Sequence, residues 1–471
     1  MKKPWEYEFH RLFSVNFCKS LRLSLARMSF DKDFVSGVGG DPYPLLKAGE
    51  EHISGGRYFA LGTERYFCAF FPYASYEITL ASLEGACGFG FRTPLGNVSI
   101  LLKNENGCLS VCFGDTEQIV PAEFIPGMKL LITARRNCFE VYTTAKEKPE
   151  FICEFCAEAL SDIYFEDNFR KSEVSLICDG SAEVVSVDSF MDSGMSQADI
   201  RPVCYENGDI IFEDGKIFFT LSFRMQKESY QGVISWVPGT CEFSLVGAIF
   251  FNCGDGAVTN DIATCLKYER KKERWLLWVC SFSHGHVLGH CQCKGDLRFG
   301  VNIADITLMP EAKENDDRCA FVGFAGDEDP DIIYDEARNL WVMSICRLDS
   351  SKHYAYHIFE GNDPFSCDRF VARAEDGDET GGSLIHSRDG LYFVCGNSFK
   401  RRADYRVYEL PDMSRHYALT FDRDDGGFRG WGSLVFLSMG TRTRVFHLTF
   451  DRHRATEYNW SYGNLYCFEA F

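Results

Sequence analysis

Residues 326–336 (GDEDPDIIYDE), followed by residues 340–347 (LWVMSICR), hold the pattern that decides the fold. An acidic turn leads into a short β-forming run, and a polar turn leads into a second, aromatic-rich run that ends at an arginine. Two β-forming runs joined by a short turn predict an antiparallel hairpin. Because the hairpin opens with acids, its first strand also carries candidate chemistry.

The same order of turns and strands recurs at residues 206–224, 260–278, 379–393 and 430–448. Together with residues 326–347 these stretches make five copies, and all but the last open with a carboxylate. Hairpin units spaced about 50–65 residues apart are typical of a β-propeller, in which each blade is a small antiparallel sheet. The sequence therefore predicts a five-bladed β-propeller.

The acids that open the blades are expected to meet, because the first strand of every blade lines the central axis. Carboxylates at close range repel one another unless some are protonated, bind a cation or face a polar ligand. A cluster of this kind does not serve stability, so the pattern indicates a functional site in an axial cavity.

The charge balance limits the partners. The 471 residues include 68 acidic and 49 basic side chains, which gives a formal net charge of −19. Nucleic acids and anionic membranes both need clustered Lys and Arg, so neither is an expected partner. Aromatic residues make up 15% of the chain, which suits a β-rich protein that binds a small oligosaccharide or glycoside. Whether the chain forms a homo-oligomer is left open.

The cysteines and the N-terminal segment indicate the compartment. The 21 cysteines are odd in number and follow no disulfide spacing, so they are predicted to be free, largely buried thiols in a reducing environment. Residues 1–28 have no unbroken apolar run, which predicts neither a signal peptide nor a transmembrane span. A cytoplasmic protein is the expectation.

Three segments are predicted along the chain. Residues 1–49 are an irregular lead-in in which residues 13–28 could form one helix, and residues 50–191 are rich in short strands separated by turn residues. Residues 196–471 form the propeller, after a boundary near residues 192–196. A last strand over residues 462–468 is expected to close the ring by pairing with the first blade.

Many short strands at the spacing of residues 50–191 predict a β-sandwich. The predicted strands are residues 76–80, 87–91, 98–102, 109–113, 129–134 and 139–142. Their order resembles a concanavalin-like jelly roll, so the fold class is all-β: an N-terminal jelly-roll sandwich followed by a five-bladed propeller. This sandwich is either a sugar-binding module or a scaffold packed on its neighbour.

The dipeptides Ala198-Asp199 and Asp329-Pro330, together with Glu379, resemble the blade-opening acids of the five-bladed glycosidases of glycoside hydrolase family 43 and its relatives in families 32, 62, 68 and 117. The resemblance covers about residues 196–471 and implies three roles. The first-blade acid is the base, or the nucleophile in retaining members. Asp329 orients the substrate and tunes pKa values, and Glu379 is the general acid.

The first blade offers two candidates for its acid. Asp199 has the residue identity of the family motif, whereas Glu206 lies about as far before its second strand as the acids of the other blades do. In the fifth blade, Trp431 lies where many relatives have a His near an axial metal. An aromatic wall is therefore expected there, with no metal and no cofactor.

This trio matches the chemistry of glycoside cleavage. One protonated carboxylic acid acts on the leaving oxygen, and one ionised carboxylate on the opposite face activates water or attacks directly. Their surroundings must push their pKa values apart. The alternatives are structural, because Asp329 could form a turn before Pro330 and Glu379 could be a loop charge.

Five more residues are candidates for binding substrate. Asp261 could bind a sugar hydroxyl or cap a turn. Arg224 and Arg347 could clamp a carboxylate or phosphate, or could be surface arginines. Arg429 belongs to a loop that leads to the axial Trp431.

The stretch 284–293 (HGHVLGHCQC) offers five potential metal ligands. It lacks a zinc spacing such as Cys-x2-Cys, so no metal site is predicted.

An exo-acting glycoside hydrolase is the leading functional prediction. The alternatives are a non-catalytic glycan-binding propeller and a glycoside phosphorylase or transferase. The last of these would need basic residues in the pocket, for which Arg201, Arg224 and Arg347 are the candidates.

Overall fold

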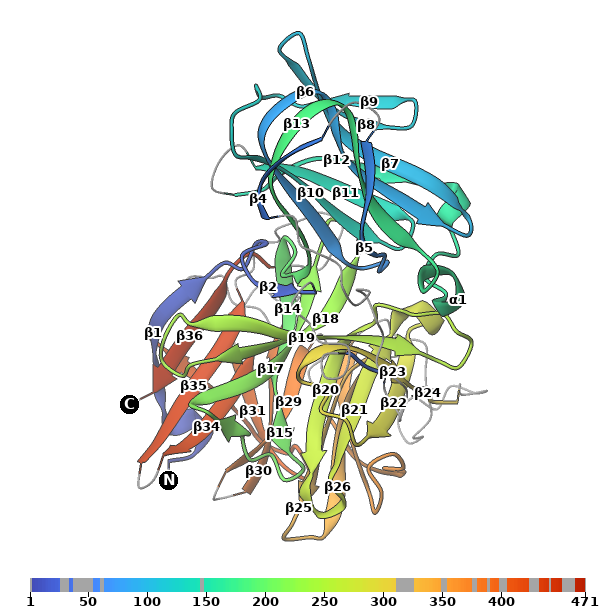
Figure 1. Ribbon diagram of the computed structural model, residues 1–471. Coiled ribbons are helices and arrows are strands. Elements are labelled where there is room, and N and C mark those ends of the chain that lie inside the picture. Colours follow the sequence, from blue (N-terminus) through green and yellow to red (C-terminus); the bar gives the residue numbers. More distant parts are fainter. Residues whose placement is uncertain are drawn as a thin grey trace.

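The computed structural model describes residues 2–25, 34–36, 54–59, 63–144, 148–310, 326–348, 354–374, 379–387, 390–397, 405–422, 432–439, 442–450 and 462–470. Within these ranges the chain forms an N-terminal β domain that lies against a five-bladed propeller (Figure 1). The prediction of an all-β chain with five blades is confirmed. Among the residues described, the helical turns are α1 (Glu166–Phe169), η1 (Pro4–Glu6), η2 (Glu158–Leu160), η3 (Arg270–Lys272) and η4 (Phe282–His284). No helix in the described part is long and apolar enough to cross a bilayer.

The N-terminal domain is organised around two long strands, β6 (Ser75–Thr93) and β13 (Glu173–Asp192), which pair with each other along most of their length. On one side of β6 the order continues to β10, β11 and β12, and on the other side to β7, β8 and β9. The remaining strands of this sheet pair with β13. The bounds are β2 (Arg22–Ser24), β4 (Ser54–Phe59), β5 (Thr63–Ala69), β7 (Gly96–Glu105), β8 (Cys108–Phe113), β9 (Thr116–Ile119), β10 (Met128–Arg135), β11 (Cys138–Thr144) and β12 (Glu150–Cys156).

All six runs predicted as strands in this domain lie in observed strands. The turn between β7 and β8 shows why its hairpin forms, because Asn106 and Gly107 have φ values of 52° and 79°. These left-handed conformations are the ones that Asn-Gly supplies in tight hairpins. The jelly-roll topology itself stays a prediction.

The propeller consists of five sheets, each with its inner strand at the axis. Blade 1 has β14 (Ser196–Pro202), β17 (Lys216–Arg224), β18 (Ser229–Trp236) and β19 (Phe243–Asn252), extended by β16 (Phe212–Glu213), β23 (Gly300–Asp305) and β3 (Phe34–Ser36). Blade 2 has β20 (Ile262–Glu269), β21 (Arg274–Ser281), β22 (Val287–Cys293) and β24 (Thr307–Leu308), with β15 (Cys204–Tyr205) beside β20. Blade 3 has β25 (Asp327–Asp335), β26 (Leu340–Leu348), β27 (Tyr354–Gly361) and β28 (Arg369–Arg373). Blade 4 has β29 (Glu379–Ser387), β30 (Gly390–Asn397), β31 (Tyr405–Glu409) and β32 (His416–Ala418).

The fifth blade contains strands from both ends of the chain. It has β34 (Ser433–Met439), β35 (Arg442–Phe450) and β36 (Leu465–Ala470), followed by β1 (Glu8–Val15) and β33 (Thr420–Phe421). β1 pairs antiparallel with β36, from Phe9 opposite Ala470 to Val15 opposite Leu465. The last strand therefore completes the last blade, and the segment before it meets the first blade at a bridge between Tyr462 and Gln197.

Two sequence-based expectations are wrong in this region. Residues 1–49 are not simply an irregular lead-in, since residues 8–15 form a propeller strand. The helix expected over residues 13–28 is replaced by the end of β1 and by β2, while residues 26–28 lie outside the described residues. The physical reason is that Phe9 is buried against blades 4 and 5, and a strand gains hydrogen bonds with β36 that an isolated short helix would lack.

The two parts share one hydrophobic core and one buried polar network. Phe71 and Tyr73 of the N-terminal domain pack on Phe250 of blade 1, with ring centroids 5.0 and 4.8 Å apart. Lys19 and Asp192 are both fully buried, and Lys19 Nζ lies 3.2 Å from Asp192 Oδ2. This pair fixes the segment after β1 to the end of β13, where the chain enters the propeller.

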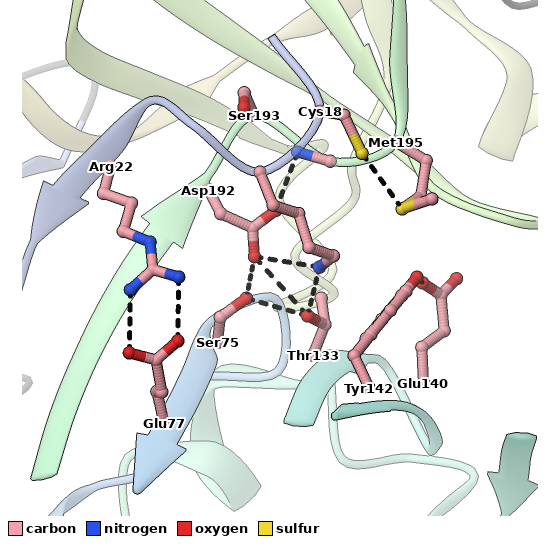
Figure 2. A network of polar contacts seen from close by, with 12 residues as sticks. Cys18, Arg22, Ser75, Glu77, Thr133, Glu140, Tyr142, Asp192, Ser193 and Met195 are labelled. Carbon is pink, nitrogen blue, oxygen red and sulfur yellow. Dashed lines mark hydrogen bonds and ion pairs between the residues drawn. The ribbon is translucent and has the colours of Figure 1, made fainter. Parts of the chain in front are cut away.

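Figure 2 shows the surroundings of this pair, with the Asp192 carboxylate facing Ser75 and Thr133. Gly194 N also donates to Asp192 Oδ1 at 2.7 Å. Burial raises the pKa of Asp192, but Lys19, Arg135 and the hydrogen bonds outweigh it and hold that pKa at about 2. The carboxylate is therefore ionised and fully engaged.

One cysteine pair differs from the expectation of free thiols. Cys138 and Cys156 lie opposite each other on β11 and β12 and form a disulfide, the one disulfide among the described residues. Cys319 lies outside the described residues, and the other described cysteines are not part of a disulfide.

Candidate functional site

A shared backbone irregularity defines the site. The inner strands of blades 1 to 4 each contain a register shift near the end where the strand begins, here called the opening end. One residue of each bulge has a left-handed backbone: Asp199 (φ 56°), Ala263 (φ 59°), Asp329 (φ 50°) and Gly381 (φ 64°). Bulges with left-handed residues re-aim side chains and are frequent beside active sites. Asp199 and Asp329 therefore occupy equivalent positions, and Glu379 lies two residues before that position in blade 4.

Asp199 is buried on β14 and pairs with Arg224 of β17, with Oδ2 3.3 Å from Nη2. Burial is the main cause that raises the pKa of Asp199 to about 6; Arg224 opposes the shift and the charge of Asp329 adds to it. The influence of Asp329 means that the two acids lie within electrostatic range of each other. Asp199 is thus a carboxyl group whose charge changes close to neutral pH.

Asp329 is held by three other elements. Its Oδ1 lies 3.5 Å from Nη2 of Arg201, which belongs to β14. Its Oδ2 accepts hydrogen bonds from Gly381 N at 3.0 Å and from the Tyr356 hydroxyl at 3.4 Å. Contacts from blades 1, 3 and 4 therefore converge on this one carboxylate at the axis.

Glu379 is the first residue of β29 and its side chain is completely buried. Arg406 Nη1 lies 3.0 Å from Oε1, and the Tyr408 hydroxyl donates to the same oxygen. Two residues further on, Gly381 donates its amide hydrogen to Asp329. Asp199, Asp329 and Glu379 thus gather at the opening ends of inner strands, and none of them lies on the outer rim.

Glu206 lies elsewhere, so its prediction as an axial acid is wrong. It follows β15, whose Cys204 and Tyr205 pair with Lys267 and Tyr268 near the far end of β20. Its Oε1 accepts a hydrogen bond from Arg270 Nε at 3.0 Å. The spacing argument failed because residues 203–215 form β15 and β16 between β14 and β17, so the first blade is longer than the others.

Three of the predicted substrate-binding residues have partners within the protein: Arg224, which pairs with Asp199, and also Asp261 and Arg347. Asp261 accepts hydrogen bonds from the Thr259 and Ser281 hydroxyls, both at 2.8 Å, and from Ser283 N at 3.0 Å. It therefore organises the turn after β21.

Arg347 pairs with Asp327 through two contacts of 2.8 and 3.0 Å, and both side chains are fully buried. Neither Arg347 nor Arg224 is a surface arginine. Trp431 and Arg429 lie outside the described residues.

Several partners of the acids were not predicted from the sequence. Tyr356, Arg406 and Tyr408 come from outer strands of blades 3 and 4, and nothing in their local sequence distinguishes them. Lys267 pairs with Asp331, with Nζ 3.1 Å from Oδ1, and Cys265 donates to the same oxygen. Burial raises the pKa of Asp331, but Lys267 and Arg201 outweigh it and lower the pKa, so this carboxylate is held in a buried ion pair.

The histidines and cysteines of residues 284–293 do not gather into a metal site in the described structure. His290 lies against Trp278 and Phe365, at centroid distances of 4.7 Å from each. Cys291 and Cys293 belong to the core of blades 1 and 2. The one group of metal-ligand spacing in the described ranges is Cys138, Glu154 and Cys156, whose two cysteines form the disulfide.

No protein-family model matches the chain, and no curated protein matches it either. Among solved structures, a thermostable family 43 glycoside hydrolase is 10% identical, covering 58% of this chain and 89% of that chain with a TM-score of 0.39. A levansucrase from Bacillus subtilis is 10% identical, covering 55% and 80% with a TM-score of 0.38. A family 62 α-L-arabinofuranosidase catalytic domain from Coprinopsis cinerea is 10% identical, covering 59% and 98% with a TM-score of 0.36. Because these sequence identities and TM-scores are low, the fold assignment rests on the sheet topology described above.

Proposed function

We propose that the chain is a glycoside hydrolase in which Glu379 is the general acid, Asp199 is the base or nucleophile, and Asp329 orients the substrate. One observation carries the proposal: three buried carboxylates from blades 1, 3 and 4 lie at the same end of the propeller axis, and two of them occupy equivalent bulges. Burying three carboxylates near one another is unfavourable for stability, so a functional reason is required.

The surroundings of the three acids suit different tasks. Asp199 has a pKa of about 6, so above that pH it supplies the ionised carboxylate that activates water or attacks the sugar. Asp329 is held by Arg201, Tyr356 and Gly381, which suits a fixed acceptor for a sugar hydroxyl. Glu379 is enclosed beside Tyr408 and Arg406, and it delivers its proton to the leaving oxygen once substrate has displaced water.

The proposed substrate is a small oligosaccharide or glycoside. The enzyme would remove one sugar at a time from an end of it. Exo-action predicts that a single sugar is the first product from an end-labelled oligosaccharide. Random internal cleavage in that assay would contradict it.

A non-catalytic glycan-binding propeller is the second candidate, and one observation favours it. Each carboxylate of the trio already has an arginine beside it: Arg224 for Asp199, Arg201 for Asp329 and Arg406 for Glu379. The Arg406 contact favours the ionised form of Glu379, whereas a general acid must carry a proton. The same pairings weigh against a phosphorylase, since Arg201, Arg224 and Arg347 are each engaged with a carboxylate.

The test is a screen with aryl glycosides of pentofuranosides, xylosides, galactosides and fructosides. Wild-type protein should release the aryl group from at least one of them. Glu379→Gln should lower the rate by about two to four orders of magnitude, the usual contribution of a positioned acid. Glu206→Gln is the matched control, because Glu206 lies at the other end of the axis, and its rate should equal that of wild type. Full activity of Glu379→Gln would refute the acid assignment, and binding without turnover would favour the glycan-binding candidate.

A further inference from the structure

The turn after β21 lies at the opening ends of two inner strands. Its residues 281–286 contain η4 and lead into β22. Ser283 N donates to Asp261 at 3.0 Å, and Gly326 N donates to the carbonyl oxygen of His286 at 2.9 Å. Asp261 and Gly326 directly precede the inner strands β20 and β25. The turn is therefore fixed across the opening ends of blades 2 and 3.

Two rings in this turn form a partly exposed surface beside the start of β25. Phe282 is 46% exposed, and the His286 ring lies against it with centroids 4.5 Å apart. His286 Nε2 is 2.9 Å from Glu328 Oε1, and the Tyr354 hydroxyl donates to the same oxygen at 3.1 Å. Because Glu328 immediately precedes Asp329 in β25, the pair of rings is tied to the backbone that carries an axial acid.

The N-terminal domain supports the same turn. Arg136, at the tip of the β10–β11 hairpin, donates from Nη2 to the Ser283 hydroxyl at 3.2 Å and to Asn260 Oδ1 at 3.1 Å. Its guanidinium also lies over the Tyr164 ring, 5.1 Å from the centroid. One side chain of the N-terminal domain thus holds the residue that follows Phe282.

We propose that Phe282 and His286 form a subsite for the second sugar of the substrate, and that Arg136 is its positioning residue. The inference rests on the proposed function and extends it to a substrate of at least two sugars. Sugar rings present apolar C–H faces that stack on aromatic rings, and an exposed aromatic beside a polar site is a common mark of ligand binding. The fixed turn means that the surface is formed before the substrate arrives, which reduces the entropy lost on binding.

Binding is measured on the Glu379→Gln background, so that the result does not depend on turnover. The probes are xylobiose, arabinobiose and β-1,3-galactobiose, each compared with its monosaccharide by calorimetry. We expect one disaccharide to bind more tightly than its monosaccharide, and Phe282→Ala to weaken only the disaccharide, by about three- to tenfold, the range for an aromatic contact.

Phe212→Ala is the matched control. Phe212 is 41% exposed, but it lies on β16 beside Ile217, at the end of blade 1 remote from Arg224. This variant should bind the disaccharide as tightly as its parent. Arg136→Ala should weaken the disaccharide in the same way as Phe282→Ala, and Arg136→Lys should restore part of the affinity.

Three results would overturn the subsite: unchanged disaccharide affinity in Phe282→Ala, an equal loss in Phe212→Ala, or no binding of any of the three disaccharides. The hydrolase proposal fails separately, if the wild-type protein releases the aryl group from none of the aryl glycosides. Loss of disaccharide binding in Phe282→Ala would still support the subsite in that case, on a glycan-binding propeller.

Discussion

Asp199 and Asp329 are the same structural position in two blades, and Arg201, two residues after Asp199, reaches across to pair with Asp329. Each has a left-handed backbone, which for a residue other than glycine costs about 1 kcal/mol or more. The chain therefore keeps two strained and buried acids facing one axis. Strain and charge that recur together in equivalent places indicate selection for chemistry.

The first prediction concerns the pH dependence of activity. Because the pKa of Asp199 is raised to about 6, chiefly by burial, its carboxylate is protonated at lower pH. The kcat/KM for an aryl glycoside should therefore fall about tenfold per pH unit below about pH 6. A profile that stays flat down to pH 4 would exclude Asp199 as the base or nucleophile.

The second prediction links the same group to stability. The folded protein binds the Asp199 proton more tightly than the unfolded chain does, so this contribution is complete below about pH 4 and is lost as the pH rises through 6. The displacement of the pKa from 3.8 to about 6 corresponds to about 3 kcal/mol. Between pH 4 and 7, wild type should lose about that much unfolding free energy relative to Asp199→Asn, as measured by urea denaturation. Parallel pH curves for the two proteins would contradict the assignment.

The third prediction concerns the buried pair at the junction of the two parts. Lys19→Met leaves the Asp192 carboxylate buried without its cation, and this should lower the free energy of unfolding by about 3–5 kcal/mol. The double variant Lys19→Met, Asp192→Asn should recover part of that loss, because the amide oxygen can still accept from Gly194. Lys103→Ala breaks an exposed pair with Glu105 and should leave the free energy of unfolding close to that of wild type, because solvent screens exposed pairs. If Lys19→Met and Lys103→Ala changed the free energy of unfolding equally, the Lys19–Asp192 pair would not be a stabilising contact.

The fourth prediction tests the N-terminal strand in the fifth blade. Phe9 is fully buried between blades 4 and 5, whereas Leu12 on the same strand is 39% exposed. Phe9→Ala should lower the unfolding free energy by about 3–5 kcal/mol and Leu12→Ala by less than about 1 kcal/mol, as measured by chemical denaturation. Similar values for the two changes would mean that β1 does not pack as the structure has it.

The candidate site was partly predictable from the sequence. Asp329 and Glu379 could be recognised because each lies at the start of a short β-forming run, where the position along the strand can be counted. Asp199 could not be separated from Glu206 by counting, since a bulge and two short inserted strands change the spacing of the first blade. Arg201 could not be assigned as the partner of Asp329, because pairing between blades depends on rotation about the axis and leaves no local pattern.

The fold, like the site, has parts that the local sequence predicts and parts that it does not. Hairpins such as β25–β26 are local and were predicted, because the alternation and the turn residues both lie within about twenty residues. The residues of β1 also alternate, but the strand's partners are β36 and β33, at the other end of the chain. A contact between the two ends of a sequence gives no local signal. The sequence therefore predicts an irregular lead-in where the structure has β1.

The position of β1 also changes what the N-terminal domain is. Since β1 precedes that domain and β14 follows it, the domain is an insertion within the propeller and not a module placed before it. Residues 196–471 expressed alone would leave the edge of β36 bare, ready to recruit a strand from another molecule. During synthesis, β1 must wait for four blades and an entire second domain before its partner exists, so ring closure is the late step in assembling the propeller that holds the acids.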